Sequence, residues 1–424
     1  MANCAIVGIN WGDEGKGRMV DLVSSDYDVV VRYQGGGNAG HTVINEHGKF
    51  ALHLLPSGIF REDVVSVIGN GVAVDPESLM NEIDYVRGKG VKLTPDNLKI
   101  SSRASLLLPW HKELDCLEEQ RLADKKYGST KQGIAPFYSD KYQKKTVLAG
   151  ELFDKDAFFD HLDGIMEWKN LTIERVYGAA PTTREQLMQW YETCCIPLMP
   201  FIGDLDDFYD RCEAEGKNIL FEAQLGSLRD IDFGIHPYTT SSSTIAAYAP
   251  IGAGAPHLKL DEIVGVVKAY STCVGEGPFT SEWSGEEAEK LRETGGEYGA
   301  KTGRPRRVGS FDVVATRYGV RKQGATAVAL TKLDVLSYMD RIPVCTRYLV
   351  NGEETDRFPF PSLLGKAQPV TEYLDGWGCD ISGVRRFEDL PAAAQNYVLY
   401  IEKQIGCFIK YVSVGPERDS IIIR

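Results

Sequence analysis

The chain lacks the features that would place it in a membrane, in a secretory route or on nucleic acid. Its 424 residues contain no apolar run of about 18 residues, so no membrane span is expected. No basic segment followed by an apolar one opens the chain, so we expect no secretory signal. Basic residues number 47 against 60 acidic ones, and the formal charge of −13 disfavours nucleic acid and anionic lipid as partners. An anionic ligand therefore needs a local cationic pocket.

Metal-binding cysteine spacings, repeats and linkers are also absent. The nine cysteines are scattered, and the only close pair, Cys194 and Cys195, does not have the spacing of metal ligands. We interpret them as reduced and mostly buried thiols of a cytoplasmic protein. Because no repeat, low-complexity tract or linker divides the chain, one large domain over residues 1–424 is expected.

Apolar runs alternate with helical patterns along the chain. A strand over residues 4–8, a glycine-rich turn, a helix over 17–24 and a strand over 28–33 predict a parallel crossover unit. Further strands are predicted over 64–68, 218–221, 263–269 and 325–330, and helices over 76–89 and 109–126. This alternation predicts an α/β fold with a large, mostly parallel, twisted sheet flanked by helices, and the glycine-rich turn after its first strand predicts a P-loop-NTPase-like core.

Three regions are expected within this domain. The strands and the turns predict an α/β core over residues 1–100 and 215–335. Residues 101–214 are mainly helical by pattern and predict an excursion from the core. Several glycine and proline breaks follow, so residues 336–424 are expected to form a C-terminal lobe.

The turn after the first strand has the chemistry of a phosphate-binding loop. It reads Asn10-Trp11-Gly12-Asp13-Glu14-Gly15-Lys16-Gly17-Arg18. Glycines let backbone amides surround an anion, and the helix start and Lys16 add positive charge. The loop departs from the Walker A pattern, which needs glycine in place of Asn10 and a hydroxyl in place of Gly17. Asp13 can take magnesium instead of that hydroxyl, because Mg²⁺ prefers hard oxygen ligands.

A second glycine-rich loop follows the next predicted strand. It reads Gln34-Gly35-Gly36-Gly37-Asn38-Ala39-Gly40-His41-Thr42. Three consecutive glycines indicate that the backbone approaches another group closely. If the two strands are adjacent and parallel, both loops open into one crevice at their carboxyl ends. We therefore predict that His41 is catalytic rather than structural.

At this spacing, the segments 11–17 and 35–42 resemble the two N-terminal signatures of the adenylosuccinate synthetase family, and the resemblance covers almost the whole chain. It implies a cytoplasmic ligase that joins L-aspartate to IMP at the expense of GTP, in the first committed step of AMP synthesis. Mg²⁺ is the implied cofactor. GTP, IMP and L-aspartate are the implied substrates, and the implied assembly is a homodimer that shares a residue across its interface.

Two downstream segments resemble the family's IMP-binding side, with departures. Gly128–Pro136 resembles the IMP loop, with Thr130 at the phosphate contact and Lys131-Gln132 in place of the family's Gly-Arg. Lys144 aligns with an arginine that reaches the neighbouring subunit's IMP site, and lysine keeps the charge but loses the bidentate fork.

The segment Phe221–Gly226 resembles a block whose glutamine steadies the hypoxanthine oxygen. Ungapped alignment places Leu225 at that position and Gln224 one residue earlier, and we expect Gln224 to make the contact. Thr240 matches a residue that binds the nucleotide phosphate.

Two later segments resemble the aspartate and guanine sites. Residues 299–307 match the aspartate loop, whose guanidinium groups suit carboxylates and supply the cationic pocket sought above. Thr331-Lys332-Leu333-Asp334 resembles the guanine motif Asn-Lys-x-Asp, and Asp334 would accept two hydrogen bonds that adenine cannot donate. Ser413–Pro416 resembles the second guanine-side loop.

The resemblance implies a complete set of site residues. The catalytic residues are Asp13, Lys16, His41 and Gln224. The GTP-binding residues are Gly12, Asp13, Glu14, Gly15, Lys16, Gly17, Arg18, Gly40, His41, Thr42, Arg306, Lys332, Leu333, Asp334, Ser413, Val414 and Gly415. The IMP-binding residues are Asp13, Glu14, Gly15, Lys16, Asn38, Ala39, Gly40, His41, Thr130, Lys144, Gln224, Thr240 and Arg304. The aspartate-binding residues are Ala300, Lys301, Thr302, Gly303, Arg304, Pro305 and Arg306, and the metal ligands are Asp13 and Gly40.

The implied chemistry has two steps. The IMP 6-oxygen attacks the γ-phosphate of GTP to give 6-phosphoryl-IMP, and the aspartate amine then displaces phosphate. Asp13 accepts the N1 proton of IMP, and His41 donates towards the transferring phosphoryl group. Lys16, Mg²⁺ and the loop amides stabilise the phosphate charge.

Three alternatives stay open at this point. A GTPase switch would share the phosphate loop and Asp334, but it needs a hydroxyl where Gly17 stands. A small-molecule kinase would explain the phosphate loop but not Asp334 together with the loop of residues 299–307. A family member with a different substrate would fit Lys131, Lys144 and Leu225.

Overall fold

The computed structural model describes residues 2–38, 40–45, 48–299 and 303–424, and a ten-stranded sheet dominates it. The strand order is β20-β19-β15-β11-β1-β10-β2-β5-β7-β9. All neighbours are parallel except β19 and β20. The strands are β1 (Asn3–Gly8), β2 (Val29–Arg32), β5 (Val65–Ile68), β7 (Leu98–Ser101), β9 (Ile202–Gly203), β10 (Ile219–Glu222), β11 (Glu262–Lys268), β15 (Ala327–Thr331), β19 (Ile409–Ser413) and β20 (Ile421–Ile423).

The predicted crossover unit at the N-terminus is present. Every residue of β1 is buried, as expected for a central parallel strand, and α1 (Lys16–Val23) packs Met19 and Val20 against the sheet. The strands β1 and β2 are parallel but not adjacent, because β10 pairs with both of them and lies between them. A crossover fixes the direction of two strands but not their distance, since a later strand can insert between them.

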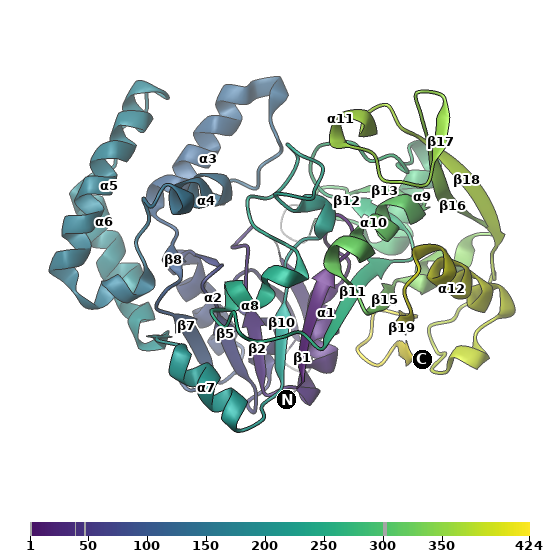
Figure 1. Cartoon of the computed structure of the whole chain (residues 1–424), viewed down its shortest axis with the longest axis horizontal. Helices are drawn as coiled ribbons and strands as arrows, with labels where there is room; N and C mark the ends of the chain where they lie inside the picture. Colours follow the sequence, from purple (N-terminus) through teal and green to yellow (C-terminus); the bar gives the residue numbers. More distant parts are fainter. Residues whose placement is uncertain (1, 39, 46–47, 300–302) are drawn as a thin grey trace.

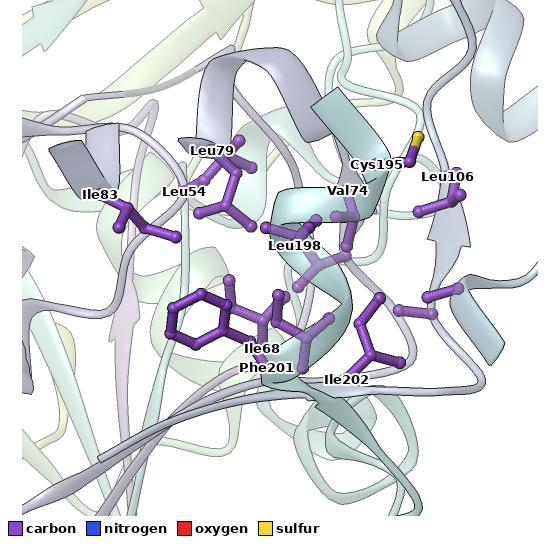
Figure 2. Close-up of a cluster of buried hydrophobic side chains, with 14 of the residues drawn as sticks. Leu54, Ile68, Val74, Leu79, Ile83, Leu106, Cys195, Leu198, Phe201 and Ile202 are labelled. Atoms are coloured by element: carbon purple, nitrogen blue, oxygen red, sulfur yellow. The ribbon is translucent and has the colours of Figure 1, made fainter. Parts of the chain in front are cut away.

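The predicted helical region stands beyond the β7 side of the sheet (Figure 1). Its helices are α3 (Pro109–Leu122), α4 (Ile134–Tyr142), α5 (Lys155–Arg175) and α6 (Arg184–Trp190). Apolar side chains join this region to the core. Leu198 and Phe201, just after α6, lie among Ile68 of β5 and Leu79 and Ile83 of α2 (Pro76–Gly88), as Figure 2 shows.

The C-terminal residues divide between two sheets. Beyond the other side of the large sheet, β16 (Arg341–Val350) pairs with β14 (Phe311–Asp312), β17 (Glu353–Thr355) and β18 (Gln368–Asp375) (Figure 1). The last strands, β19 and β20, instead extend the ten-stranded sheet, and α12 precedes them. The division into a core, a helical excursion and a C-terminal lobe stays a prediction.

The remaining elements connect these layers. The other strands are β3 (His41–Asn45), β4 (Gly48–Leu52), β6 (Ala73–Val74), β8 (Ser105–Leu106), β12 (Ser271–Cys273), β13 (Arg307–Gly309), β14 (Phe311–Asp312), β16 (Arg341–Val350), β17 (Glu353–Thr355) and β18 (Gln368–Asp375). The other helices are α7 (Asp206–Ala214), α8 (Ala249–Ala253), α9 (Gly285–Gly295), α10 (Val313–Gln323), α11 (Pro361–Leu364) and α12 (Ala392–Ile405). The cysteines are free thiols. Among the described residues, no helix combines the length and apolar character needed to cross a membrane.

Candidate functional site

The first glycine-rich loop is held in shape by a buried carboxylate. Gly12, Asp13 and Gly15 have φ values of 103°, 57° and 98°, in the left-handed region that favours glycine. Glu14 accepts hydrogen bonds from the backbone N–H of Gly12 at 2.8 Å and pairs with Lys16 Nζ at 2.6 Å. The predicted phosphate ligand Lys16 is therefore neutralised internally, and an incoming phosphate must compete with Glu14 for it.

Gly17 brings the two glycine-rich loops into contact. A Cβ at Gly17 would lie 2.8 Å from the Cβ of His41, so any side chain there would push β3 away from α1. The missing hydroxyl of the Walker A pattern is thus explained by the close approach of His41. The loop containing Gly40 and Asn38 leads into β3, and the side-chain oxygen of Asn38 is buried without a partner among the described residues.

His41 is oriented by a carboxylate from the middle strand. Its Nδ1 donates to Glu222 at the end of β10, and Glu222 also accepts from the backbone N–H of Ser57 at 2.7 Å and from the Ser57 hydroxyl at 2.6 Å. The other ring nitrogen, Nε2, is buried and has no partner among the described residues. A single acceptor nitrogen of His41 is therefore left for a ligand.

Burial and charge set the ionisation of this pair. Burial lowers the pKa of His41, and the Glu222 carboxylate opposes this only in part, so the free imidazole is neutral. Burial alone would raise the pKa of Glu222, but His41 and Arg32 outweigh it and hold this pKa below its ordinary value. The arrangement is a neutral imidazole that donates to an ionised carboxylate, which fixes the tautomer.

Gln224 is engaged by the chain's own backbone. Its Oε1 accepts from Gly36 N at 3.1 Å, and its Nε2 donates to Gly36 O at 2.9 Å and to His53 O at 3.0 Å. The side chain is fully buried. Both amide hydrogens are therefore in use within the chain, where they hold the second glycine-rich loop in place, and the expected contact of this amide with a base stays a prediction.

Leu225, not Gln224, lies beside the phosphate loop. A Cβ at Gly12 would lie 3.2 Å from the Cα of Leu225. Leu225 has a φ of 58°, which is uncommon for a residue with a side chain and marks a position fixed by its surroundings.

A buried carboxylate connects the arginine loop to the first glycine-rich loop. Arg306 pairs with Asp13 Oδ2 at 3.0 Å and with Glu297 Oε2 at 2.8 Å. Glu297, just after α9, also pairs with Lys268 at 2.9 Å and with Lys332 at 3.2 Å. Burial alone would raise the pKa of Glu297, but these three cations hold it well below its ordinary value. Burial lowers the pKa of Lys268 to about 8, with Glu297 opposing.

The guanine-like motif lies next to the first glycine-rich loop. Thr331, the last residue of β15, donates from its hydroxyl to the carbonyl oxygen of Glu14 at 2.8 Å. Lys332 has a left-handed φ of 61°, and Leu333 is buried. Asp334 is half-buried, and its pKa is raised chiefly by that burial. A carboxylate with this exposure can accept hydrogen bonds from a ligand.

Arg18 ties α1 to the C-terminal loop. Its guanidinium donates to Ser413 Oγ at 2.6 Å and to the carbonyl oxygen of Glu417. Ser413 in turn donates to Gly415 O at 3.2 Å, and Val414 between them is fully buried. The two segments predicted for the guanine side, residues 331–334 and 413–415, thus both contact the segment 14–18.

The other predicted site residues differ in exposure. Thr130 and Lys144 are exposed, and Arg304 is exposed with its guanidinium 3.9 Å from Glu276. Thr240 is nearly buried, and its hydroxyl has no partner among the described residues. Gly303 and Pro305 precede Arg306 in the same loop. Ala39, Ala300, Lys301 and Thr302 lie outside the described residues, and Thr42 is placed only as part of β3.

Oxygen ligands for a magnesium ion are available beside the loops. Asp13 is partly exposed, and the Gly40 carbonyl belongs to the facing loop. Carboxylate and carbonyl oxygens fit Mg²⁺. Elsewhere in the described chain, Asp210, Glu213 and His257 form the one close group of possible ligands, and all three are exposed.

Local sequence patterns missed Glu222, Ser57, Glu297 and Lys268. Glu222 stands in a segment that we singled out, but nothing in that segment points to His41, which is 181 residues away. A buried acid at the end of a predicted core strand was the available signal, because burial of an unpaired carboxylate is costly.

The fold and these loops define an α/β enzyme with a phosphate-loop-like site. A family model described as adenylosuccinate synthetase matches residues 5–422. Curated adenylosuccinate synthetases are similar along their whole length. The protein from Caldanaerobacter subterraneus subsp. tengcongensis is 44% identical over 100% of this chain and 99% of its own. Adenylosuccinate synthetase 2 from Pseudoalteromonas translucida is 44% identical over 100% of both. The chain therefore belongs to the adenylosuccinate synthetase family, and it is a ligase.

Solved structures agree with this assignment. The fully ligated adenylosuccinate synthetase from Plasmodium falciparum superposes with a TM-score of 0.93 at 36% identity, over 99% of each chain. The succinoaminodeoxyadenylate synthetase of cyanophage S-2L has a TM-score of 0.62 at 17% identity, over 100% of this chain and 95% of its own, which shows a shared fold alone.

Proposed function

We propose that this chain joins L-aspartate to IMP at the expense of GTP, giving adenylosuccinate, GDP and phosphate in the AMP branch of purine biosynthesis. The observation that carries the proposal is the convergence of Asp13, Lys16 and His41 on two facing glycine-rich loops. The Nε2 atom of His41 is buried and has no partner among the described residues, so it too is available to a ligand. Family membership supports the choice of substrates.

Asp13 is the proposed base for the first step. Its carboxylate is partly exposed and forms an ion pair with Arg306. On binding of IMP, Asp13 accepts the N1 proton, and the 6-oxygen becomes the nucleophile towards the γ-phosphate of GTP. Positioning does most of this work, because an ordinary aspartate is a weak base. Arg306 then remains available to the GTP phosphates and to the carboxylate of aspartate.

His41 is the proposed hydrogen-bond or proton donor towards the transferring phosphoryl group. The neutral ring has no proton on Nε2, so this role requires protonation when the polyphosphate arrives. The ionised Glu222 supports that change, because a carboxylate beside an imidazole raises the pKa of the imidazole. Glu222 acts here as a positioning residue.

Charge on the phosphates is balanced by the loop and by the helix. Lys16 exchanges Glu14 for a phosphate oxygen, and the N-terminus of α1 adds its partial positive charge. Asp13 and the Gly40 carbonyl would hold Mg²⁺, which supplies further positive charge to the phosphate oxygens.

The remaining proposed contacts are those to the guanine base, to IMP and to aspartate. The guanine base is assigned to Asp334, Leu333 and Lys332 and to the loop Ser413–Gly415. IMP is assigned to Asn38, Thr130, Thr240 and Arg304, and aspartate to the loop of residues 300–306. Lys144 is exposed, which suits a residue that a second copy of the chain would use in a homodimer.

Product formation from IMP, GTP, L-aspartate and Mg²⁺, with one component omitted at a time, tests the function. We expect adenylosuccinate only when all four are present, and none from the Asp13→Ala variant. Loss of GTP that does not depend on aspartate would contradict the ligation and favour a GTPase or a kinase.

A further inference from the structure

A cationic cavity lies on the outer face of α10, away from the loops described above. It has a volume of about 690 Å³ and is lined by Val314, Arg317, Tyr318, Arg321, Lys322, Asp356, Arg357 and Phe358. The lining positions on α10 recur at helical spacing and therefore form one face of the helix. The segment 356–358, which follows β17, forms the opposite wall. Figure 1 labels both α10 and β17.

Four cations line this cavity against one carboxylate. Arg317 donates to Gln404 O at 2.9 Å and pairs with Asp356 at 3.1 Å. The guanidinium groups of Arg321 and Arg357 have no hydrogen bond or ion pair within the described residues, and both side chains are exposed. A net positive cluster on a chain of formal charge −13 is a local exception that attracts anions.

Aromatic rings hold the floor of the cavity in place. The rings of Tyr318 and Phe358 are stacked, with centroids 4.6 Å apart, and they join the two walls. The Tyr318 hydroxyl donates to Phe233 O at 2.7 Å. Lys322 lies over the rings of Phe233 and Tyr318 at 4.9 and 5.2 Å. Cation–π contacts leave the ammonium hydrogens of Lys322 available to an acceptor.

We propose that this cavity binds a small anion that carries at least two phosphate groups. The two unpaired guanidinium forks stand on different walls of the cavity, one on α10 and one on the segment 356–358, and each fork matches the oxygens of one phosphate group. The volume lies in the range of about 300–1,000 Å³ that is typical of small-molecule sites. A small ligand is favoured over a macromolecule, because the cations line a single cavity of this volume.

The position of the cavity sets it apart from the site of ligation. None of its lining residues belongs to the glycine-rich loops, the arginine loop or the guanine-like motif. The opposite face of α10 packs on the first of those loops: Thr316 Oγ1 accepts from Asn10 Nδ2 at 3.1 Å. A ligand bound here therefore sits one helix away from the phosphate loop, in the place of an effector rather than a substrate.

Calorimetric titration with inorganic pyrophosphate at low ionic strength tests this inference. The protein is the full-length Lys16→Ala variant, in which the phosphate loop has lost its charged ligand. We expect about one pyrophosphate per chain to remain bound, and binding roughly tenfold or more weaker after the further changes Arg321→Glu and Arg357→Glu. No binding to the Lys16→Ala protein, or equal binding after the two reversals, would overturn the proposal.

A matched control separates this cavity from the general charge of the protein. Lys92→Glu with Arg175→Glu makes the same change in net charge at exposed positions elsewhere in the chain, and binding should stay as in the parent. Equal weakening in that control would also overturn the proposal. If the reversals impair folding, Arg321→Gln with Arg357→Gln replaces them. Without the Lys16 change, either pair should leave ligation and the unfolding temperature unchanged.

A parallel titration with adenosine diphosphate tests whether the ligand is a nucleotide or a bisphosphate without a base. Tighter binding than that of pyrophosphate, weakened again by Arg321→Glu with Arg357→Glu, means that the ring of a nucleotide contributes through the Tyr318 and Phe358 edge of the cavity. Equal binding means that the cavity reads only the phosphates, as for a bisphosphate without a base.

Discussion

At the scale of single residues, Gln224 and Leu225 are neighbours in the chain with different surroundings. The Gln224 amide bonds to the backbone of Gly36 and His53, whereas Leu225 lies against Gly12 of the phosphate loop. A glutamine placed at position 225 would bring a free amide to the side where the base of IMP is proposed to bind. We therefore predict that the residue at position 225 influences how the base is held.

We expect Leu225→Gln to tighten IMP binding. One added neutral hydrogen bond contributes about 1 kcal/mol, or roughly a fivefold lower dissociation constant. The matched variant Gln224→Ala should instead lower stability by about 2 kcal/mol, because it leaves buried backbone groups of Gly36 and His53 unpaired. Equilibrium titration with IMP and thermal unfolding measure the two effects. The opposite pattern, with weaker IMP binding and unchanged stability in Gln224→Ala, would return the base contact to Gln224.

The residue scale also shows what local pattern can and cannot predict. The phosphate-binding role of the glycines around Lys16 could be predicted, because a glycine-rich turn that leads into a helix start has a recognisable sequence. The requirement for glycine at position 17 could not be predicted, because it depends on contact with His41, which belongs to another loop. Glu222 was missed for the same reason. Contacts between distant segments are set by packing, which leaves no trace in local spacing.

At the scale of elements, strand order was the main uncertainty. Each predicted strand exists, because a buried parallel strand is a continuous apolar run. The insertion of β10 between β1 and β2 could not be predicted, since hydrophobicity does not state which strand is the neighbour. That insertion has a consequence for the site: it carries Glu222 to the end of the strand between the two glycine-rich loops.

The contact of α10 with the phosphate loop predicts an effect of Gly319→Ala. A Cβ at this position would lie 2.2 Å from the carbonyl oxygen of Ile9, and backbone cannot move aside as a flexible side chain can. We expect a loss of about 1–3 kcal/mol of stability, as for other overpacked sites, together with reduced ligation. Denaturant unfolding and product formation measure both.

Gly164 of α5 is the control for Gly319. It is exposed in the interior of a helix, and no atom lies within 4 Å of its added Cβ. Gly164→Ala should therefore raise stability by about 0.5–1 kcal/mol, because alanine loses less backbone entropy on folding. Similar effects of the two substitutions would show that packing of α10 on the loop does not limit stability.

At the scale of the whole molecule, a buried histidine links α3 to its neighbours and makes stability depend on pH. His111 Nε2 donates to Asp140 at 2.9 Å, and Nδ1 accepts from Leu108 N at 2.9 Å, so the ring is neutral. Burial lowers the pKa of His111, and Asp140 opposes this in part. As the pH falls below the ordinary value of 6.5, the unfolded chain takes up a proton that the native chain refuses.

Acidification should therefore lower the unfolding temperature. The contribution of His111 approaches about 1.4 kcal/mol per pH unit until the native pKa is reached. His41 acts with the same sign, since burial lowers its pKa too. In His111→Gln we expect lower stability at about pH 7.5 but a smaller further loss on going to about pH 5.5. Thermal unfolding across this pH range tests the prediction. If the unfolding temperature of the variant falls with pH as steeply as that of the parent, the pH dependence belongs to other groups.

The proposed homodimer makes a prediction that no single chain can satisfy. Lys144 is exposed on its own chain, and its proposed partner is the IMP of a second copy, whereas Lys16 serves the site of its own chain. Lys144→Ala and Lys16→Ala should each be nearly inactive as homodimers. In a mixed dimer, one site combines both changes and the other has neither.

Random exchange of equal amounts of the two variants places half of the chains' sites in mixed dimers, and half of those are intact, so about a quarter of wild-type activity should return. The rate of product formation after mixing, followed against total protein, measures this recovery. Two copies of the same variant provide the baseline. If activity does not rise above that baseline while the chains do exchange, Lys144 acts within its own chain or not at all. Full activity in the unmixed Lys144→Ala protein would lead to the same conclusion, because the IMP phosphate would then be held without a borrowed cation.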